Sequence, residues 1–270
     1  MHTNELYQSQ PYTKSFFDYH QDGSEKSARE IVPFILRLVQ PQRVVDVGCG
    51  TGTWLAVFKE SGVEHILGID GDYVEESTLK IPKENFSPLD LQKPIQLDEE
   101  FDLVVSLEVA EHLPESCAET FVNSLTALGL VVLFSAAIPF QGGVHHINEQ
   151  WPEYWVKLFE KKDYVVVDCI RKKVWQNSNV EWWYAQNTLL FVEGEYLNNH
   201  PLLKAEGENT DPSYLSIVHP RNFIDKSQSE AEHKRLSNLS NRSLSEVLSY
   251  LPQKTKNALK RRLLKMYRSS

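Results

Sequence analysis

The chain has 270 residues and a formal net charge of −9, with an isoelectric point near 5.5. This acidic balance argues against a surface built to bind nucleic acid. Hydrophobic residues make up 41% of the chain, enough for a folded core, and three well-separated cysteines indicate neither a disulfide framework nor a zinc site. Because no signal-peptide core and no apolar run of membrane-spanning length is evident, we expect a soluble, cytoplasmic protein.

The chain is expected to have three parts. Residues 1–40 begin with a polar, aromatic-rich segment that is a candidate lid, followed by a helix expected to start at Ser24 and to be disturbed at Pro33. Residues 41–196 alternate apolar strands with amphipathic helices and should form the main domain. Residues 197–270 are expected to form a partly ordered linker and a C-terminal amphipathic helix.

The main domain is organised around residues 43–54. They are typical of a buried strand, a glycine-rich turn and the start of a helix. Gly48, Gly50 and Gly52 allow a tight turn and close approach of the backbone to a ligand, and a helix from Thr53 would direct free N–H groups at it. The Gly-x-Gly-x-Gly spacing differs from the Gly-x-Gly-x-x-Gly of dinucleotide-binding turns, which disfavours a nicotinamide-dependent oxidoreductase.

Further strands are expected at residues 65–70, near 86, at 101–107 and at 129–137, alternating with helices. This alternation predicts an α/β, doubly wound, mostly parallel sheet whose ligand lies at the carboxyl ends of the strands. Residues 164–170 and 188–192 should add an antiparallel pair, giving seven strands with an antiparallel last strand. The first four strands carry acidic residues in or just after them: Asp46, Asp70, Asp90 and Glu108.

The run from Asp46 to Gly52 (Asp-Val-Gly-Cys-Gly-Thr-Gly) resembles motif I of the class I S-adenosylmethionine-dependent methyltransferases, and the resemblance extends over about residues 43–137. It implies a Rossmann-like fold, an enzyme, and S-adenosylmethionine as cofactor. Asp70 would hold the ribose hydroxyls, Asp90 would accept a hydrogen bond from the adenine amino group, and Glu108 would lie near the methionine end. The cofactor-binding residues are then expected to be Asp46, Gly48, Gly50, Asp70, Asp90, Leu91 and Glu108.

The methyl acceptor should face residues 138–150, a flexible polar loop after the fifth strand. Its His-x-Asn-Glu-Gln-Trp run, followed later by Trp-Tyr-x-Gln-Asn, looks like a subgroup of bacterial methyltransferases that we associate loosely with glycan and natural-product modification. The residues expected to contact the acceptor are Asn148, Trp182, Trp183, Gln186 and Asn187.

A hydroxyl acceptor needs a base with a pKa near neutrality, and histidine meets that requirement. His146 is the first candidate and His145 the second, whereas an amine or amide acceptor would be positioned by Glu149, Asn148 or Gln186. We therefore expect methylation of a hydroxyl, or of a nitrogen, on a small molecule, glycan or natural product. Two alternatives stay open: an N-methyltransferase acting on a peptide or protein side chain, and a non-catalytic S-adenosylmethionine-binding accessory protein.

No metal site is expected. His146-x-x-Glu149 brings two candidate ligands together, but neither HExxH nor HxxEH is present and no third ligand is evident.

Residues 254–268 carry seven basic side chains and no acidic one. With interleaved leucines, this segment is either a solvated helix or a weak contact with an anionic membrane surface or an acidic partner. No nucleic-acid partner is expected.

Overall fold

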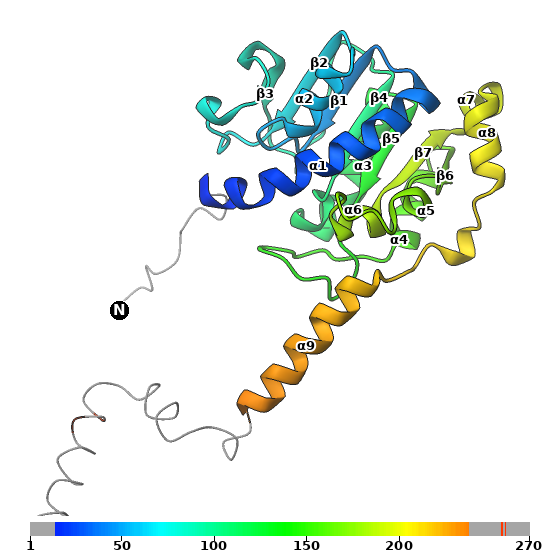
Figure 1. Ribbon diagram of the computed structural model, residues 1–270. Helices are drawn as coiled ribbons and strands as arrows, with labels where there is room; N and C mark the ends of the chain where they lie inside the picture. Colours follow the sequence, from blue (N-terminus) through cyan, green and yellow to red (C-terminus); the bar gives the residue numbers. More distant parts are fainter. Residues whose placement is uncertain (1–13, 238–254, 256, 258–270) are drawn as a thin grey trace, which may run out of the picture. The chain divides into compact units, whose positions relative to one another are not determined.

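The computed structural model describes residues 14–237, 255 and 257, and it has the predicted α/β architecture. Seven strands of the described chain form one sheet in the order β3-β2-β1-β4-β5-β7-β6 (Figure 1). The strands are β1 (Arg43–Val47), β2 (His65–Asp70), β3 (Phe86–Pro88), β4 (Leu103–Leu107), β5 (Val131–Ser135), β6 (Tyr164–Val167) and β7 (Leu189–Glu193). All neighbours from β3 to β5 are parallel. β7 is antiparallel to both β5 and β6, as predicted.

Helices follow most strands and cover the sheet. They are α1 (Lys14–Val39), α2 (Thr53–Glu60), α3 (Ala118–Leu128), α4 (Pro152–Glu160), α5 (Arg171–Val174), α6 (Trp182–Asn187), α7 (Gly194–Asn199) and α8 (Pro201–Glu208). A further helix, α9 (Pro220–Ser237), belongs to a second unit that begins at Pro220. Short 3₁₀ turns include Ala110–His112, directly after β4.

Successive residues of each strand face opposite sides of the sheet, so the sheet takes part in two apolar cores. On one side, Val44 packs in a cluster with α1, α2 and α5 to α8, whereas its neighbour Val45 packs on the other side with α3 and α4. Burial on both faces explains why these strands are continuous apolar runs rather than alternating ones.

The strand order places a switch point between β1 and β4. From β1 the chain builds outward through β2 and β3, then returns to form β4 on the other side of β1. In open parallel sheets, ligands bind at the carboxyl ends of the strands beside such a point. The loops after β1, β2, β4 and β5 therefore meet at one edge.

The structure differs from the sequence expectation at both ends of the main domain. α1 starts at Lys14 rather than at Ser24 and continues through Pro33, while residues 1–13 lie outside the described part. Contacts divide the chain after His219 rather than at 196, because Leu197, Leu203 and Leu215 are buried in the core.

The expected linker contains helices α7, α8 and α9. Nearly all of the basic segment 254–268 lies outside the described residues. None of the helices in the described part combines the length and apolar character needed to cross a membrane.

Arg171 is a buried charge that holds the second half of the domain together. Its side chain is 1% exposed and forms a bidentate pair with Asp168, with distances of 2.9 and 2.7 Å. Its Nη1 also donates to the carbonyl oxygens of Gln186, at 3.2 Å, and Leu215, at 2.7 Å. One guanidinium therefore joins the end of β6, helix α6 and the segment before α9.

Replacing Arg171 by leucine should lower the free energy of unfolding by about 3–5 kcal/mol, because the change leaves the Asp168 carboxylate without its partner. Urea denaturation measures this. The matched control is Lys161→Ala, which breaks an exposed pair with Glu119 and should cost about 0–1 kcal/mol. Equal effects of the two substitutions would contradict the assignment.

Candidate functional site

The glycine-rich turn after β1 has the conformation that its sequence predicts. Gly48, Gly50 and Gly52 have φ values of 88°, 53° and 78°, in the left-handed region that favours glycine. A Cβ added at Gly48 would lie 2.3 Å from a methyl carbon of Val109 in the loop after β4. The Val109 side chain therefore packs directly against the Gly48 backbone, a contact that only glycine allows at this position.

Asp70 ends β2 and faces the same turn. Its Oδ2 accepts a 2.7 Å hydrogen bond from the amide of Gly50, and its Oδ1 accepts from the amide of Gly71 and from the hydroxyl of Tyr73. Burial raises the pKa of Asp70, and these three donors oppose the rise. The carboxylate is thus fixed in place at the edge of the cleft.

A cavity of about 660 Å³ extends from this carboxylate toward β3. Its lining includes Gly48, Gly50, Asp70, Asp90, Leu91 and Glu108. Asp90 is an exposed side chain at the outer end, where the amide of Gln92 and the ammonium of Lys93 lower its pKa.

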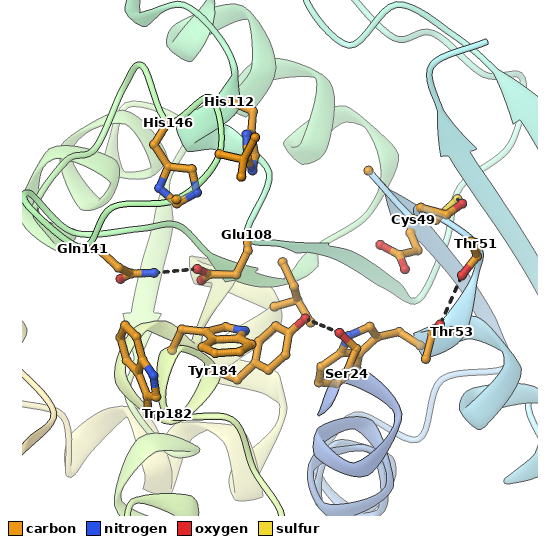
Figure 2. Close-up of a pocket in the computed structure, with 18 of the residues that line it drawn as sticks. Ser24, Cys49, Thr51, Thr53, Glu108, His112, Gln141, His146, Trp182 and Tyr184 are labelled. Atoms are coloured by element: carbon orange, nitrogen blue, oxygen red, sulfur yellow. Dashed lines mark hydrogen bonds between the residues drawn. The ribbon is translucent and has the colours of Figure 1, made fainter. Parts of the chain in front are cut away.

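A second cavity of about 370 Å³ lies on the other side of the glycine turn. It is lined by Asp46, the turn, and residues from three later segments: Glu108, His112, Gln141, His146, Trp182, Trp183 and Tyr184. Figure 2 shows the two histidines on one side of the cavity and Trp182 and Tyr184 on the other, with Glu108 between them. Gly48, Gly50, Glu108 and His112 line both cavities, so the two meet at these residues.

Glu108 is held by side-chain amides at this junction. Its two carboxylate oxygens accept from Asn187 and Gln141, each at 3.0 Å. Gln186 in turn donates to the side-chain oxygens of Gln141 and Asn187. Burial raises the pKa of Glu108, and the hydrogen bonds from Asn187, Ser135 and Gln141 oppose it. Its φ of 55° is unusual for a residue other than glycine, and such strain is typical of functional sites.

The loop of residues 138–150 is fixed from two sides. The amides of Ile147 and Asn148 donate to the carbonyl oxygen of Glu111, at 2.9 and 3.0 Å. The carboxylate of Glu149 accepts from the amides of Phe140 and Gly142 and lies 3.1 Å from Nδ1 of His146. Glu149 therefore braces the loop and orients His146, whereas the sequence predicted a position facing the acceptor.

These contacts bring His146 to His112. The two rings meet edge to face, with centroids 4.8 Å apart. Burial, and next the charge of His146, lower the pKa of His112 to about 4, so its imidazole is neutral at physiological pH. Glu111 lies beside them and is fully buried. Burial, and next the charge of Glu108, raise its pKa well above the ordinary range.

The structure gathers most of the predicted site residues, but not all of them line a cavity. Asp46, Trp182, Trp183 and His146 line the smaller cavity. Gln186 and Asn187 are buried behind Glu108 rather than facing the acceptor side. His145, Asn148 and Glu149 are outside both linings: His145 is exposed, and Asn148 is buried with its side-chain nitrogen unbonded.

Sequence reasoning missed Gln141 and Tyr73, which have no motif of their own, and gave Glu111 no role. The signal for Glu111 was its position three residues after Glu108 in the turn after β4.

Comparison with known proteins identifies a family. Residues 19–187 match the family model described as "Methyltransferase domain". The ribosomal protein L11 methyltransferase of Thermotoga neapolitana is 36% identical over 81 residues, which are 27% of this chain and 30% of that protein. The chain thus matches less than a third of that relative's length.

Solved structures include similar folds. The methyltransferase domain of bacterial CtHen1-C is 22% identical, and the match covers 63% of this chain and 98% of that one, with a TM-score of 0.46. CalS10 from Micromonospora echinaspora, an amino pentose methyltransferase solved with S-adenosylmethionine bound, is 14% identical, with coverage of 71% and 100% and a TM-score of 0.48. At these identities the likeness concerns the fold alone.

Asp46 yields a prediction about stability and pH. It is 3% exposed, and burial, then the charge of Asp70, raise its pKa well above the ordinary range. The folded state therefore binds the proton of the Asp46 carboxyl group more tightly than the unfolded state does. As the pH rises from the ordinary aspartate pKa toward the raised pKa of the folded state, the contribution of Asp46 to stability declines. Asp46→Asn should therefore stabilise the ligand-free chain at pH 8 by about 1–3 kcal/mol, as expected for a costly buried group, and by less at pH 4.5.

Thermal unfolding across this pH range measures the effect. Asp90→Asn is the control, because the lowered pKa of Asp90 predicts no gain on substitution. A destabilised Asp46→Asn chain at pH 8 would refute the electrostatic argument.

Proposed function

The chain belongs to the methyltransferase-domain family, and from this premise we propose that it transfers the methyl group of S-adenosylmethionine to an acceptor hydroxyl, or to a nitrogen. The acceptor class that we propose is a small molecule, glycan or natural product. The observation that carries the proposal is that Glu108 and His112 line both cavities, so a group held in one cavity can meet a group held in the other.

The larger cavity fits the cofactor. The backbone of Gly48 lines this cavity, and Val109 packs against its Cα so closely that a side chain there would displace the loop after β4. Asp70 would hold the ribose hydroxyls, and Asp90, beside Leu91, would accept from the adenine amino group. When bound, the cofactor supplies a methyl group already activated by the positive charge of its sulfonium.

The cavity that joins it supports a role in holding the acceptor. Trp182 and Trp183 provide an apolar wall of the kind that binds the flat faces of sugar or aromatic rings. Glu108 is fixed by Gln141 and Asn187 and so offers an acceptor oxygen in a constant position. Such positioning is the main contribution that a protein makes when the transferred group is already activated.

His146 is the residue proposed to act on the proton of a hydroxyl acceptor. It lines the smaller cavity, and the carboxylate of Glu149 next to Nδ1 leaves Nε2 as the free nitrogen. The carboxylate also fixes the orientation of the ring, as is usual for histidines that exchange protons.

His146→Ala should reduce turnover by about 10²–10⁴-fold and leave the affinity for S-adenosylmethionine near that of the wild type. The assay is release of the demethylated cofactor with panels of sugar, phenolic and peptide acceptors. His65→Ala is the matched control, because His65 begins β2 at the opposite edge of the sheet, and it should retain turnover.

Full turnover in His146→Ala would remove the histidine from the proposal. Cofactor binding without turnover for every acceptor class would instead favour a non-catalytic accessory protein.

A further inference from the structure

The side chains of Glu111, His112 and His146 form a three-residue cluster at the junction of the two cavities. One oxygen or nitrogen atom from each lies within 4.8 Å of those of the other two. Two come from the turn after β4 and one from the loop after β5, and the hydrogen bonds from Ile147 and Asn148 to the carbonyl of Glu111 hold these segments together. The backbone of the fold therefore maintains the cluster.

Glu111 is the observation that requires an explanation. Its side chain is 0% exposed, and neither carboxylate oxygen makes a hydrogen bond. A second buried carboxyl group, Glu108, lies close enough to disfavour its charge. A buried carboxyl group that makes no hydrogen bond and lies beside a second buried acid is costly unless a cation compensates for it. A cation bound beside the Glu111 carboxylate would therefore stabilise the cluster.

We propose that Glu111, His112 and His146 bind a divalent first-row transition-metal ion. Two imidazoles and one carboxylate are a donor set that such ions accept, and three protein ligands leave positions open for a substrate oxygen. An all-oxygen site would suit Mg²⁺ instead. The sequence led us to expect no metal site, because His146 and Glu149 were the only candidate ligands close together; in the structure the cluster contains His146 but not Glu149.

The surroundings of His146 fit the role of a ligand. Nδ1 lies 3.1 Å from the Glu149 carboxylate, and metal-binding histidines usually donate their second ring N–H to such a partner. The ring packs closely against Gly143, where an added Cβ would come within 2.2 Å of Nε2, so a larger residue there would displace the imidazole. His112 and His146 lie together on one side of the smaller cavity (Figure 2).

The metal would also assist the proposed methyl transfer, and this part of the inference rests on that proposed function. A hydroxyl bound at an open position loses its proton at a lower pH than a free hydroxyl, and here that proton would pass to solvent. His146 would then act as a ligand rather than as a base, because the bound cation would lower the pKa of the hydroxyl and solvent would accept the proton. The junction of the cavities is the place where an acceptor oxygen has to lie.

Metal binding is measured on the full, untagged chain after treatment with EDTA and dialysis. Titration with Co²⁺, followed by visible absorption and calorimetry, should show one equivalent bound, and Mg²⁺ should compete poorly. Glu111→Gln, which preserves shape, and His146→Ala should each weaken Co²⁺ binding by more than about 100-fold. Glu149→Gln should weaken it by about 10–100-fold, and His145→Ala, which changes the exposed neighbouring histidine, should bind as the wild type does.

Folding is checked by thermal unfolding with and without Co²⁺. The ion should raise the melting temperature of the wild type and of His145→Ala but not that of Glu111→Gln. Absence of a stoichiometric site, or equal Co²⁺ affinity in wild type, Glu111→Gln and His146→Ala, would overturn the proposal.

Activity separates this inference from the proposed function. Full methyl transfer after metal removal would refute the role of the metal while leaving the methyltransferase proposal intact. A chain that binds Co²⁺ through these residues but methylates no acceptor would support the metal site and count against the proposed function alone.

Discussion

The parallel alignment of β1, β2, β4 and β5 is the constraint on which the rest of the structure depends. Parallel strands bring their carboxyl ends to one edge, so four loops that are far apart in sequence meet there. Asp70 bonds to the turn after β1, and the loop after β5 bonds to the carbonyl of Glu111 after β4. A shift in the register of one strand would separate the side chains that form the junction of the two cavities.

The site concentrates buried acidic groups that do not favour stability. The pKa values of Asp46, Glu108 and Glu111 are all raised, and burial is the largest cause for each. The buried guanidinium of Arg171, by contrast, has full partners: it pairs with the Asp168 carboxylate and donates to two backbone carbonyl oxygens. The contrast indicates that the acids at the junction are retained for a ligand, because an apolar or amide side chain would cost less.

Most of the fold and the cofactor side of the site could be predicted because their signals are local. Adjacent residues alone predict the strand and the glycine turn at 43–54. Asp70 is predicted from its spacing along the chain after the glycine turn. The family and the fold are confirmed. The individual binding roles stay predictions, although Gly48 and Asp70 do line one cleft.

The parts that could not be predicted depend on contacts distant in sequence. Gln141 matters because Gln186 and Asn187, more than forty residues later, surround it. Glu149 was expected near the acceptor because it lies in the polar loop after β5, but its carboxylate accepts hydrogen bonds from the amides of its own loop. The burial of residues beyond 196 could not be predicted, because a few widely spaced leucines anchor a largely polar segment to the core.

The central claim is that the cleft between the glycine turn and Asp70 binds S-adenosylmethionine. Isothermal titration calorimetry of the full chain with S-adenosylmethionine, its demethylated product and NAD tests this most directly. We predict one site for the first two ligands, no binding of NAD, and an affinity at least about tenfold weaker in Asp70→Ala, since a hydrogen bond to a charged group contributes about 1.5–3 kcal/mol. Binding of NAD in place of S-adenosylmethionine, or undiminished affinity in Asp70→Ala, would contradict it.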